Sequence, residues 1–538
     1  MNLLSSFDWI VIAVYFVLVY AIALRVTRRG TGSRETSQGY FLAGRNAGWF
    51  VIGASLFASN IGSEHLVGLA GTGAASGDAV GQFEVLASII LLVLGWVFVP
   101  FYLRSGVSTM PEFLERRYSP SARWYLAIIS IVGYVLTKIS VTVAAGGIVF
   151  KSLMGLDFWT GALLVVVLTG VYTVIGGLRA VLYTDVLQAG VLIVGATVVT
   201  ALGLHELGGW NRMTELAGDG FMDMWLPSSH PSFPWTGILL GAPILGVWYW
   251  CTDQFIVQRV LAARNLDQAR GGTIFAGFLK LLPVFIFVIP GVVAYGLAQT
   301  GQIQLATPDE ALPTLVGVLL PAGLRGLVVA GLLAALMSSL SSVFNSCSTL
   351  VTLDIYQKIR PQASERQLVV VGQVSTVVLV GLALLWVPLM SRISGQLYTY
   401  LQSVQAYISP PIAAVFLVGV FWSRVNARGA MLSLLGGFVL GALRLVAELT
   451  TGEEATGFIA RYAQMNFLHF AVLLFVICVV LLVVGSFTAP QASRVQLRGL
   501  TYATLGTKAP RSERHGLLVA LSLILLACVA AVWLWFRG

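Results

Sequence analysis

Long apolar runs recur along the whole chain and are separated by short polar segments. A bilayer core of about 30 Å is crossed by roughly 20 apolar residues in a helix. The runs are continuous, whereas the strands of a membrane barrel alternate apolar and polar residues. The pattern therefore predicts an all-α polytopic membrane protein with fourteen transmembrane helices, at 9–26, 48–73, 79–103, 123–152, 158–176, 180–204, 234–258, 271–298, 322–352, 367–390, 396–421, 429–449, 464–487 and 516–536.

Composition supports this class. Of the 538 residues, 57% are hydrophobic and only 10% are charged, whereas a soluble domain is about a quarter charged. Soluble enzymes and nucleic-acid binders are excluded as descriptions of the whole chain. We expect a lipid bilayer as its surroundings, no nucleic acid, and no obligate protein partner.

The basic residues predict the orientation of the helices. An even number of spans puts both termini on one side, and the loops on the other side carry 23 of the 32 basic residues. Cytoplasmic loops are enriched in Lys and Arg. The loops 205–233, 299–321 and 450–463 are long or acidic. We therefore expect a multi-pass protein of the plasma or bacterial inner membrane with both termini extracytoplasmic.

Two spans carry a polar interruption, at 59–65 and at 248–254, and they are five spans apart. An odd offset reverses orientation, so spans 2–6 and 7–11 are candidates for a five-plus-five inverted repeat whose broken helices form a binding site. The alternative is that glycine and polar residues there only pack helices closely. The repeat predicts an extra N-terminal helix and basic loop (1–47), a first repeat (48–204), an extracellular loop (205–233), a second repeat (234–421) and three additional helices (422–538).

Charged residues inside the spans are the first candidates for function, because each costs about 2.5–3.5 kcal/mol at a helix centre. The alternative for any of them is an internal ion pair that fixes helix packing. Glu84 and Lys280 lie in otherwise apolar runs and offer an acceptor and a donor to a bound polyol. The set comprises Glu84, Asp185, Asp253 and Lys280, with Glu64 and Lys138 of less certain depth.

A serine run and an aromatic run are the other candidates. Residues 338–342 place four hydroxyls within five positions, and a hard cation such as sodium prefers oxygen ligands. Serines in membrane helices also commonly bond to the carbonyl four residues back. Trp248, Tyr249 and Trp250 flank the second interruption, and ring faces suit the CH surface of a sugar. We find no motif typical of a catalytic or cofactor site and expect the protein not to be an enzyme.

Six motifs, in order, strongly resemble the sodium/solute symporter family and within it the sodium/glucose cotransporters. The resemblance covers about residues 40–445 and implies a fourteen-helix protein with a five-plus-five inverted-repeat core. The motifs are GASLFASNIGSEHLVGLAGTGAASG (53–77), STMPEFLERRY (108–118), GGLRAVLYTDVLQ (176–188), WYWCTDQFIVQRVLAARN (248–265), ALMSSLSSVFNSCSTL (335–350) and SPPIAAVFLVGVFW (409–422).

The resemblance also implies sites. One sodium ion would be bound by the carbonyls of Ala58, Ile61 and Ala335 and the hydroxyls of Ser338 and Ser339. A second sodium site, as in members that couple two ions, would use Asp185, Ser341 and Ser342. Tyr249 resembles a ring that stacks on the sugar and closes its inward exit, and Asp253 and Arg259 match a polar pair that assists gating. The positions that match sugar contacts are Asn60, His65, Glu84, Tyr249, Trp250, Lys280 and Gln402.

Three departures from the family pattern leave the identity of the sugar open. Glu64 stands where the animal glucose carriers resemble Ser-Gly-His, Val85 stands where a tryptophan commonly follows the glutamate, and Gln405 replaces a small hydroxyl.

We expect a symporter that couples inward flow of Na+, two ions per substrate, to uptake of a hexose such as glucose or galactose by alternating access. The alternatives are a sodium symporter for another small polar solute, such as an inositol, a sialic acid or an amino acid, and a membrane sensor built on a transporter scaffold. A sensor needs a signalling domain, and the 22 residues from 517 to 538 contain none.

Overall fold

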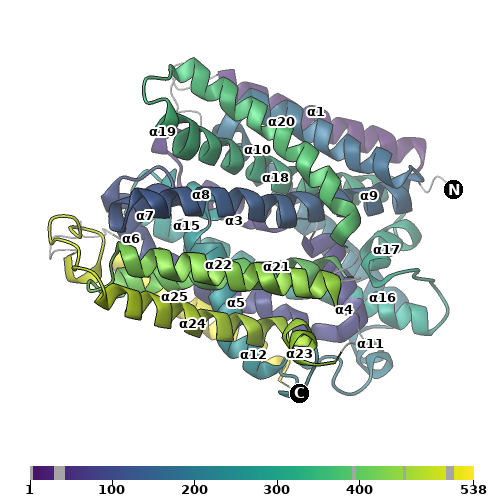
Figure 1. Cartoon of the computed structure of the whole chain (residues 1–538). Helices are drawn as coiled ribbons and strands as arrows, with labels where there is room; N and C mark the ends of the chain where they lie inside the picture. Colours follow the sequence, from purple (N-terminus) through teal and green to yellow (C-terminus); the bar gives the residue numbers. More distant parts are fainter. Residues whose placement is uncertain are drawn as a thin grey trace.

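The computed structural model describes residues 4–28, 43–62, 64–390, 396–451, 456–504 and 514–537. Within these ranges the chain is helical, and the only β-type pairings are two isolated bridges. Figure 1 shows the long helices side by side in a bundle, with the axes of most of them roughly aligned. Parts of the basic loops at 25–47 and 494–514, the acidic residues Glu453 and Glu454, and the side chain of Arg179 lie outside the described residues.

The helices follow the apolar runs. The bounds of the long and site-forming elements are α1 Ser6–Arg28, α3 Trp49–Asn60, η3 Glu64–Leu69, α4 Ala70–Ser76, α5 Gln82–Val93, α6 Val99–Ser105, α7 Met110–Arg117, α8 Pro120–Tyr134, η6 Val135–Ile139, α9 Ser140–Met154, α10 Phe158–Leu207, α11 Trp210–Ala217, α12 Trp235–Leu240, α13 Ala242–Gly246, η7 Val247–Thr252, α14 Gln254–Leu261, α15 Leu266–Leu279, α16 Ile289–Gln299, η9 Pro308–Glu310, α17 Ala311–Leu319, α18 Leu324–Thr349, η10 Leu350–Tyr356, α19 Gln357–Ile359, α20 Glu365–Met390, α21 Leu397–Phe421, α22 Ala427–Thr450, α23 Phe458–Gln464, α24 Phe467–Phe487 and α25 His515–Trp535.

Eleven segments among the described residues are helical, long and apolar enough to cross a bilayer. Two shorter apolar helices, Trp49–Asn60 and Phe158–Gly170, are additional to these. The predicted spans 158–176 and 180–204 both lie in α10, which has 50 residues. A straight helix of this length would extend about 75 Å, more than twice the thickness of a bilayer core. The all-α polytopic class is confirmed, and the count of fourteen spans stays a prediction.

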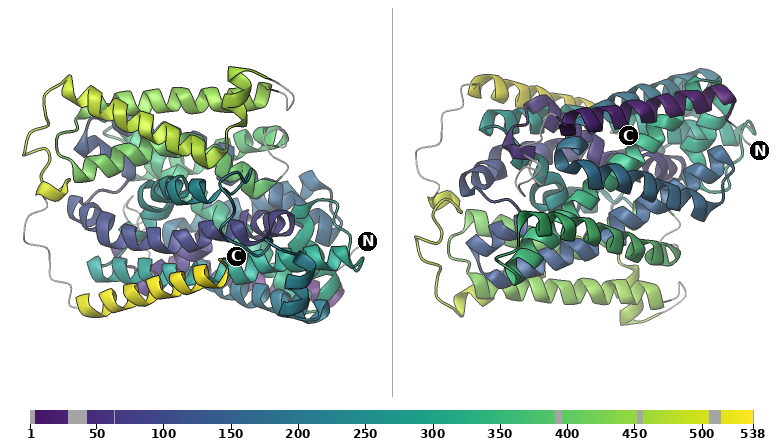
Figure 2. Two further views of the ribbon diagram at one scale, coloured as in Figure 1. Left: turned by 90° about the horizontal axis from the view of Figure 1, so that it is seen from below. Right: turned by 90° about the horizontal axis from the view of Figure 1, so that it is seen from above.

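Burial separates inner from outer helices. The apolar window of α18 is 94% buried, whereas the windows of α1, α20 and α25 are 28% buried. The exposed side chains on these outer helices are large and apolar, for example Val17, Val377 and Leu523. Lipid is the surrounding that such faces require. Figure 2 shows α25 on the outside of the bundle in its left view and α1 on the outside in its right view.

Two helices are broken where the sequence places its polar interruptions. The first break follows α3, where Ile61 has ψ 85° and leaves the helical conformation before η3 begins at Glu64. The second break is at Asp253, which has an extended backbone (φ −77°, ψ 128°) between η7 and α14. At the first break, a Cβ on Gly62 would lie 2.1 Å from Ser339 Oγ. A glycine at position 62 therefore lets the broken helix approach α18.

Both termini lie at one end of the bundle. Near the N-terminus, the Asp8 carboxylate accepts hydrogen bonds from Gly323 N and Gly326 N, at the start of α18. Near the C-terminus, the carbonyl of Phe536 accepts a hydrogen bond from Met224 N in the loop 205–233. In Figure 2, α25 runs toward the end at which α1 begins. The shared end agrees with an even number of spans.

Candidate functional site

A polar network joins the two broken helices and their neighbours α5 and α15. Lys280 Nζ, at the end of α15, donates hydrogen bonds to Glu84 Oε2 on α5 and to Asn60 Oδ1 at the end of α3. His65 Nε2 lies 3.1 Å from Glu84 Oε1, and Asn60 Nδ2 donates to the Tyr249 hydroxyl at 2.9 Å. All of these side chains are buried, and Lys280 is 1% and Glu84 3% exposed. The opposite charges of Glu84 and Lys280 therefore compensate each other in a low-dielectric interior.

A cavity opens beside this network. Its accessible volume is about 60 Å³, which is smaller than the roughly 300–1,000 Å³ of most small-molecule sites. The lining combines carboxylate, amide, imidazole and ammonium groups with aromatic rings. His65 Nδ1 is buried and has no hydrogen-bond partner among the described residues. The cavity thus offers both hydrogen-bonding groups and ring faces to a small polar molecule.

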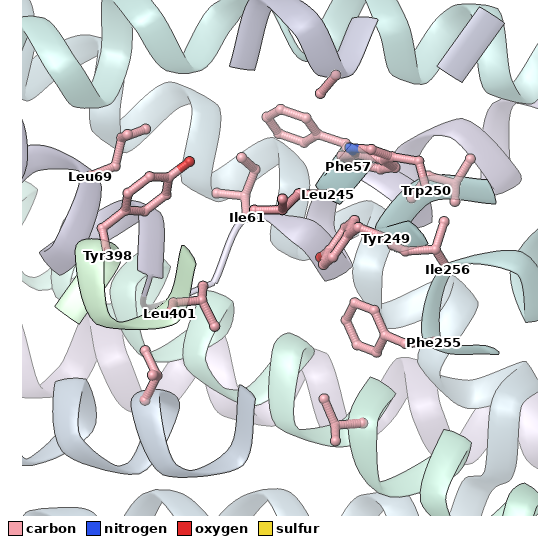
Figure 3. Packing of buried hydrophobic residues seen from close by; sticks show 14 of the residues in the cluster. Phe57, Ile61, Leu69, Leu245, Tyr249, Trp250, Phe255, Ile256, Tyr398 and Leu401 are labelled. Atoms are coloured by element: carbon pink, nitrogen blue, oxygen red, sulfur yellow. The ribbon is translucent and has the colours of Figure 1, made fainter. Parts of the chain in front are cut away.

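All seven residues predicted to contact the sugar line this one cavity: Asn60, His65, Glu84, Tyr249, Trp250, Lys280 and Gln402. Figure 3 shows the rings of Tyr249 and Trp250 apart from Tyr398 and Leu401, with Ile61 and Leu245 between the two groups. Tyr249 and Trp250 meet edge to face, with ring centroids 5.0 Å apart. The structure therefore brings together residues from α3, η3, α5, η7, the end of α15 and α21, and the first and last of them are more than 300 positions apart in the sequence.

Sequence reasoning did not identify the whole lining. Tyr398 and Phe83 also border the cavity, and their rings contact each other edge to face. Tyr398 is one helical turn before Gln402, and this spacing was the available signal. Of the three departures from the family pattern, Glu64 and Gln405 line the cavity, whereas Val85 is buried in an apolar cluster that includes Leu525 of α25.

A second polar cluster lies where α3, α10 and α18 meet. The Asp185 carboxylate accepts hydrogen bonds from Ser55 at 2.6 Å, Ser59 at 3.1 Å and Ser338 at 2.6 Å. Ser338 Oγ is also 3.3 Å from the carbonyl of Ala58. Ser338 therefore connects the two predicted sodium sites. Ser55 and Ser59 were not predicted to belong to either site.

The remaining predicted sodium ligands occupy different positions around this cluster. Ser339 Oγ donates to the carbonyl of Ser59 at 3.3 Å, and Ser342 Oγ lies 3.1 Å from Ser59 Oγ. Ser341 Oγ instead donates to the carbonyl of Ser338 on its own helix. Ile61 lies at the first break, and Ala335 is one turn before Ser339 on α18; both are buried. Hydroxyl, carbonyl and carboxylate oxygens are the ligands that a hard cation prefers.

Asp253 and Arg259, which were predicted to assist gating, each have other direct partners in the structure, and their role in gating stays a prediction. Asp253 forms its ion pair with Lys138. Arg259 Nε donates to Ser55 Oγ at 3.1 Å, and Arg259 Nη2 donates to Ser342 Oγ. The reason is helix geometry: Asp253 is at the break and faces η6, whereas Arg259 is more than a turn further along α14 and faces α3 and α18. Arg259 therefore belongs to the second polar cluster, around Asp185.

The model of a family described as "Sodium:solute symporter family" matches residues 40–437. Among curated relatives, "Sodium/glucose cotransporter 1" of Oryctolagus cuniculus is 42% identical over 95% of this chain and 83% of its own length. "Sodium/myo-inositol cotransporter" of Mus musculus is 40% identical over 95% of this chain and 78% of its own length.

Solved structures support the fold. The substrate-bound outward-open state of a Na+-coupled sialic acid symporter matches with a TM-score of 0.76 and 21% identity, over 91% of this chain and 99% of that one. A nucleobase-cation-symport-1 family transporter, in a closed conformation with bromovinylhydantoin bound, matches with a TM-score of 0.52 and 15% identity, over 86% and 97% of the two chains.

Proposed function

Because the chain belongs to the sodium:solute symporter family, we propose that it takes up a hexose, such as glucose or galactose, by alternating access with two sodium ions per sugar. Membership of the family itself establishes the general function, without the identity of the substrate or the number of ions. The protein is a sodium-coupled solute symporter of a membrane and not an enzyme, its substrate is a small molecule, and Na+ is its co-transported ion.

The hexose assignment is supported by one observation above all. The seven residues expected to contact a sugar line a single cavity, and they supply acceptors from Glu84, donors from Lys280 and mixed groups from Asn60, His65 and Gln402. Tyr249 and Trp250 add ring faces for the CH surface of a pyranose. A hexose has several hydroxyls to satisfy, and a buried polar group left unpaired costs about 1–3 kcal/mol.

An inositol is the second candidate. It presents a ring of hydroxyls similar to that of a hexose, and the relative named for myo-inositol is 40% identical to this chain. Glu64 and Gln405 border the cavity beyond the seven residues. Two additional hydrogen-bonding side chains suit a ring that carries a hydroxyl on every carbon.

The binding of two ions is proposed around Asp185, Ser341 and Ser342 and around Ala58, Ile61, Ala335, Ser338 and Ser339. We further propose that the end of the bundle that holds both termini is extracytoplasmic. The excess of basic residues in the opposite loops supports this orientation. Labelling of cysteines introduced at each terminus with a membrane-impermeant reagent in intact cells tests it, and protection of both would contradict it.

Uptake into proteoliposomes tests the substrate. We expect accumulation of radiolabelled glucose or galactose under an inward Na+ gradient, none under an equal K+ gradient, and much less in Gln402→Ala. Accumulation of myo-inositol with no accumulation of either hexose would favour the second candidate. Sodium-independent equilibration of every solute would contradict coupled transport by the reconstituted protein.

A further inference from the structure

A cavity of about 350 Å³ at the end of the bundle opposite the termini is lined by three arginines, Arg45, Arg104 and Arg264. It lies away from the substrate cavity and the Asp185 cluster, with which it shares no lining residue. In Figure 1, α6 and α15, which border it, lie toward the end away from the marked N-terminus. The function derived above uses none of these arginines.

A short backbone pairing brings two of the arginines together. Ala47 N donates to the carbonyl of Ala262 at 2.9 Å, and Arg264 N donates to the carbonyl of Ala47 at 3.1 Å. This bridge joins the segment before α3 to the segment before α15, so Arg45 and Arg264 lie on either side of it. The segment before α3 precedes the first helix break, and the segment before α15 follows the second.

Arg45 is held in an unfavourable backbone conformation at this place. Its φ is 51°, the only positive φ of a non-glycine residue among the described residues, and such a conformation costs about 1–2 kcal/mol. Its Nη2 donates to the carbonyls of Gly106 and Val107 at 3.1 and 2.9 Å, while its Nε has no partner among the described residues. These contacts therefore hold the Arg45 guanidinium at the cavity, and its Nε–H is left to donate a hydrogen bond to a ligand.

The other groups at the cavity also suit an anion. The side chain of Arg264 is exposed and makes no hydrogen bond or ion pair with the described residues. Asn265 caps the 14-residue helix α15, and its Oδ1 accepts from Gln268 N at 3.0 Å, which leaves its amide NH2 for another acceptor. The positive end of the α15 dipole lies here as well. The nearby carboxylate of Asp267, in the first turn of α15, is not part of the lining.

We propose that this cavity, defined by Arg45, Arg104, Arg264 and Asn265, binds the phosphate group of an organic phosphate. The lining brings three guanidiniums to one space, and the planar fork of arginine matches phosphate oxygens bidentately. Pro100 and Leu103 provide an apolar wall for the carbon part of the ligand. The bound phosphate links the segment before α3, the end of α6 and the start of α15, and so stabilises the arrangement of these inner ends.

A phosphate can come from solution or from the headgroup of an anionic lipid, and the test separates the two sources. Arg264→Gln removes one charge without removing a contact to the protein. Arg360→Gln is the matched control, because Arg360 is also exposed, follows α19 and lies outside the cavity. Both variants lose the same charge and are compared with the unaltered full chain in detergent and in lipid nanodiscs.

The first measurement titrates inorganic phosphate against thermal unfolding in detergent, with chloride at equal ionic strength as reference, since exposed charges are screened by salt. We expect phosphate to raise Tm in the unaltered protein and in Arg360→Gln, with an apparent Kd that increases about tenfold or more in Arg264→Gln. That result assigns the site to a soluble phosphate.

The second measurement compares nanodiscs of phosphatidylcholine with nanodiscs that contain phosphatidylglycerol. A rise in Tm with phosphatidylglycerol that is lost in Arg264→Gln and kept in Arg360→Gln supports the site with a lipid headgroup as its ligand. If neither phosphate nor phosphatidylglycerol distinguishes Arg264→Gln from Arg360→Gln, the proposal is overturned, and the arginines serve topology and loop packing alone.

Discussion

Lys138 Nζ lies 3.0 Å from Asp253 Oδ2, and this buried ion pair connects η6 to the break between η7 and α14. Lys138 also lies over the rings of Phe255 and Tyr249, at 3.5 and 4.2 Å from their centroids. The ammonium group is thus held beneath the aromatic wall of the substrate cavity. It connects the ring proposed to close the inward exit to a charged residue at the adjacent helix break.

Removing one partner of this pair should destabilise the protein strongly. Asp253→Asn and Lys138→Met each leave an uncompensated buried charge, for which about 3–5 kcal/mol is typical. The double variant should lose less than the sum of the two. Thermal unfolding in detergent measures this, with Arg212→Gln as control, because its pair with Glu215 is exposed. Additive losses in the double variant would show that the pair is not coupled.

Tyr249 should act through its ring more than through its hydroxyl. The ring contacts Trp250 and borders the cavity, while the hydroxyl accepts one hydrogen bond, from Asn60. Tyr249→Phe keeps the ring and loses a bond worth about 1 kcal/mol, so it should retain much of the accumulation. Tyr249→Ala should abolish accumulation in proteoliposomes. Full accumulation by the alanine variant would contradict a role in closing the exit.

Gln402 and Glu84 should contribute to sugar binding and not to sodium binding. Gln402→Ala removes a polar group from the cavity and should weaken sugar binding at least about tenfold, which corresponds to about 1.4 kcal/mol. Glu84→Ala should weaken it as much and also lower Tm, because Lys280 loses its carboxylate partner. Calorimetry at saturating Na+ measures both, with the exposed Gln302→Ala as control. Unchanged sugar affinity in both variants would contradict the assignment of the cavity.

Asp309 should make stability depend on pH. It lies in η9, between α16 and α17, outside the apolar spans. Its Oδ2 accepts a hydrogen bond from Leu397 N at the start of α21, and its Oδ1 is buried without a partner among the described residues. Burial is the main cause that raises the pKa of Asp309 to about 7, and the bond from Leu397 opposes it.

The direction of this pH dependence follows from the protonation of Asp309 in the folded and unfolded states. The folded protein holds a proton on Asp309 that the unfolded chain releases near pH 4, so this group favours folding in acid, and the contribution falls as pH rises toward 7. One pKa unit corresponds to about 1.4 kcal/mol, so the effect amounts to a few kcal/mol. Asp309→Asn should match the unaltered protein in Tm at pH 5 and exceed it at pH 8. A lower Tm than the unaltered protein at pH 8 would show that the charged carboxylate is needed as a cap.

Features that depend on a short stretch of sequence were predicted correctly, whereas contacts between segments far apart in the sequence were not. Apolar runs about 20 residues long and polar breaks inside them are local patterns, so the all-α class and the breaks near Asn60 and Asp253 were predicted correctly. The seven cavity residues were predicted from the family resemblance, and the structure places them around one cavity. Whether they bind the sugar stays a prediction, as do the repeat boundaries.

Partnerships between distant helices were not predictable in the same way. Lys138 and Asp253 are 115 positions apart, and nothing in either local sequence indicates that η6 faces the second break. Ser55 and Ser59 are small polar residues in an apolar helix and resemble packing residues until their bonds to Asp185 are seen. The hydrogen bonds of Arg259 to Ser55 and Ser342 were not predicted either, because the side-chain direction along α14 decides its direct partners.

The second polar cluster, around Asp185, should determine how many sodium ions move with each sugar. The Asp185 carboxyl accepts hydrogen bonds from Ser55, Ser59 and Ser338, and a second sodium ion would compensate its negative charge when it is ionised. The alternative is that Asp185 only balances Arg259, which it reaches through Ser55. Each charge that crosses 100 mV gains about 2.3 kcal/mol, so two ions support a sugar gradient of roughly two-thousandfold from voltage alone, and one ion about fortyfold.

Reversal potentials in proteoliposomes decide between one and two ions. We expect two charges per sugar for the unaltered protein and about one for Asp185→Asn and Ser342→Ala, with the sodium Hill coefficient falling toward one. Ser341→Ala should have a smaller effect if Ser341 keeps its bond to Ser338 during transport. Ser346→Ala is the matched control on the same helix, because Ser346 bonds to Gln258 and to the carbonyl of Ser342 and not to Asp185. A ratio of one charge per sugar in the unaltered protein would mean that Asp185 balances Arg259 and binds no second ion.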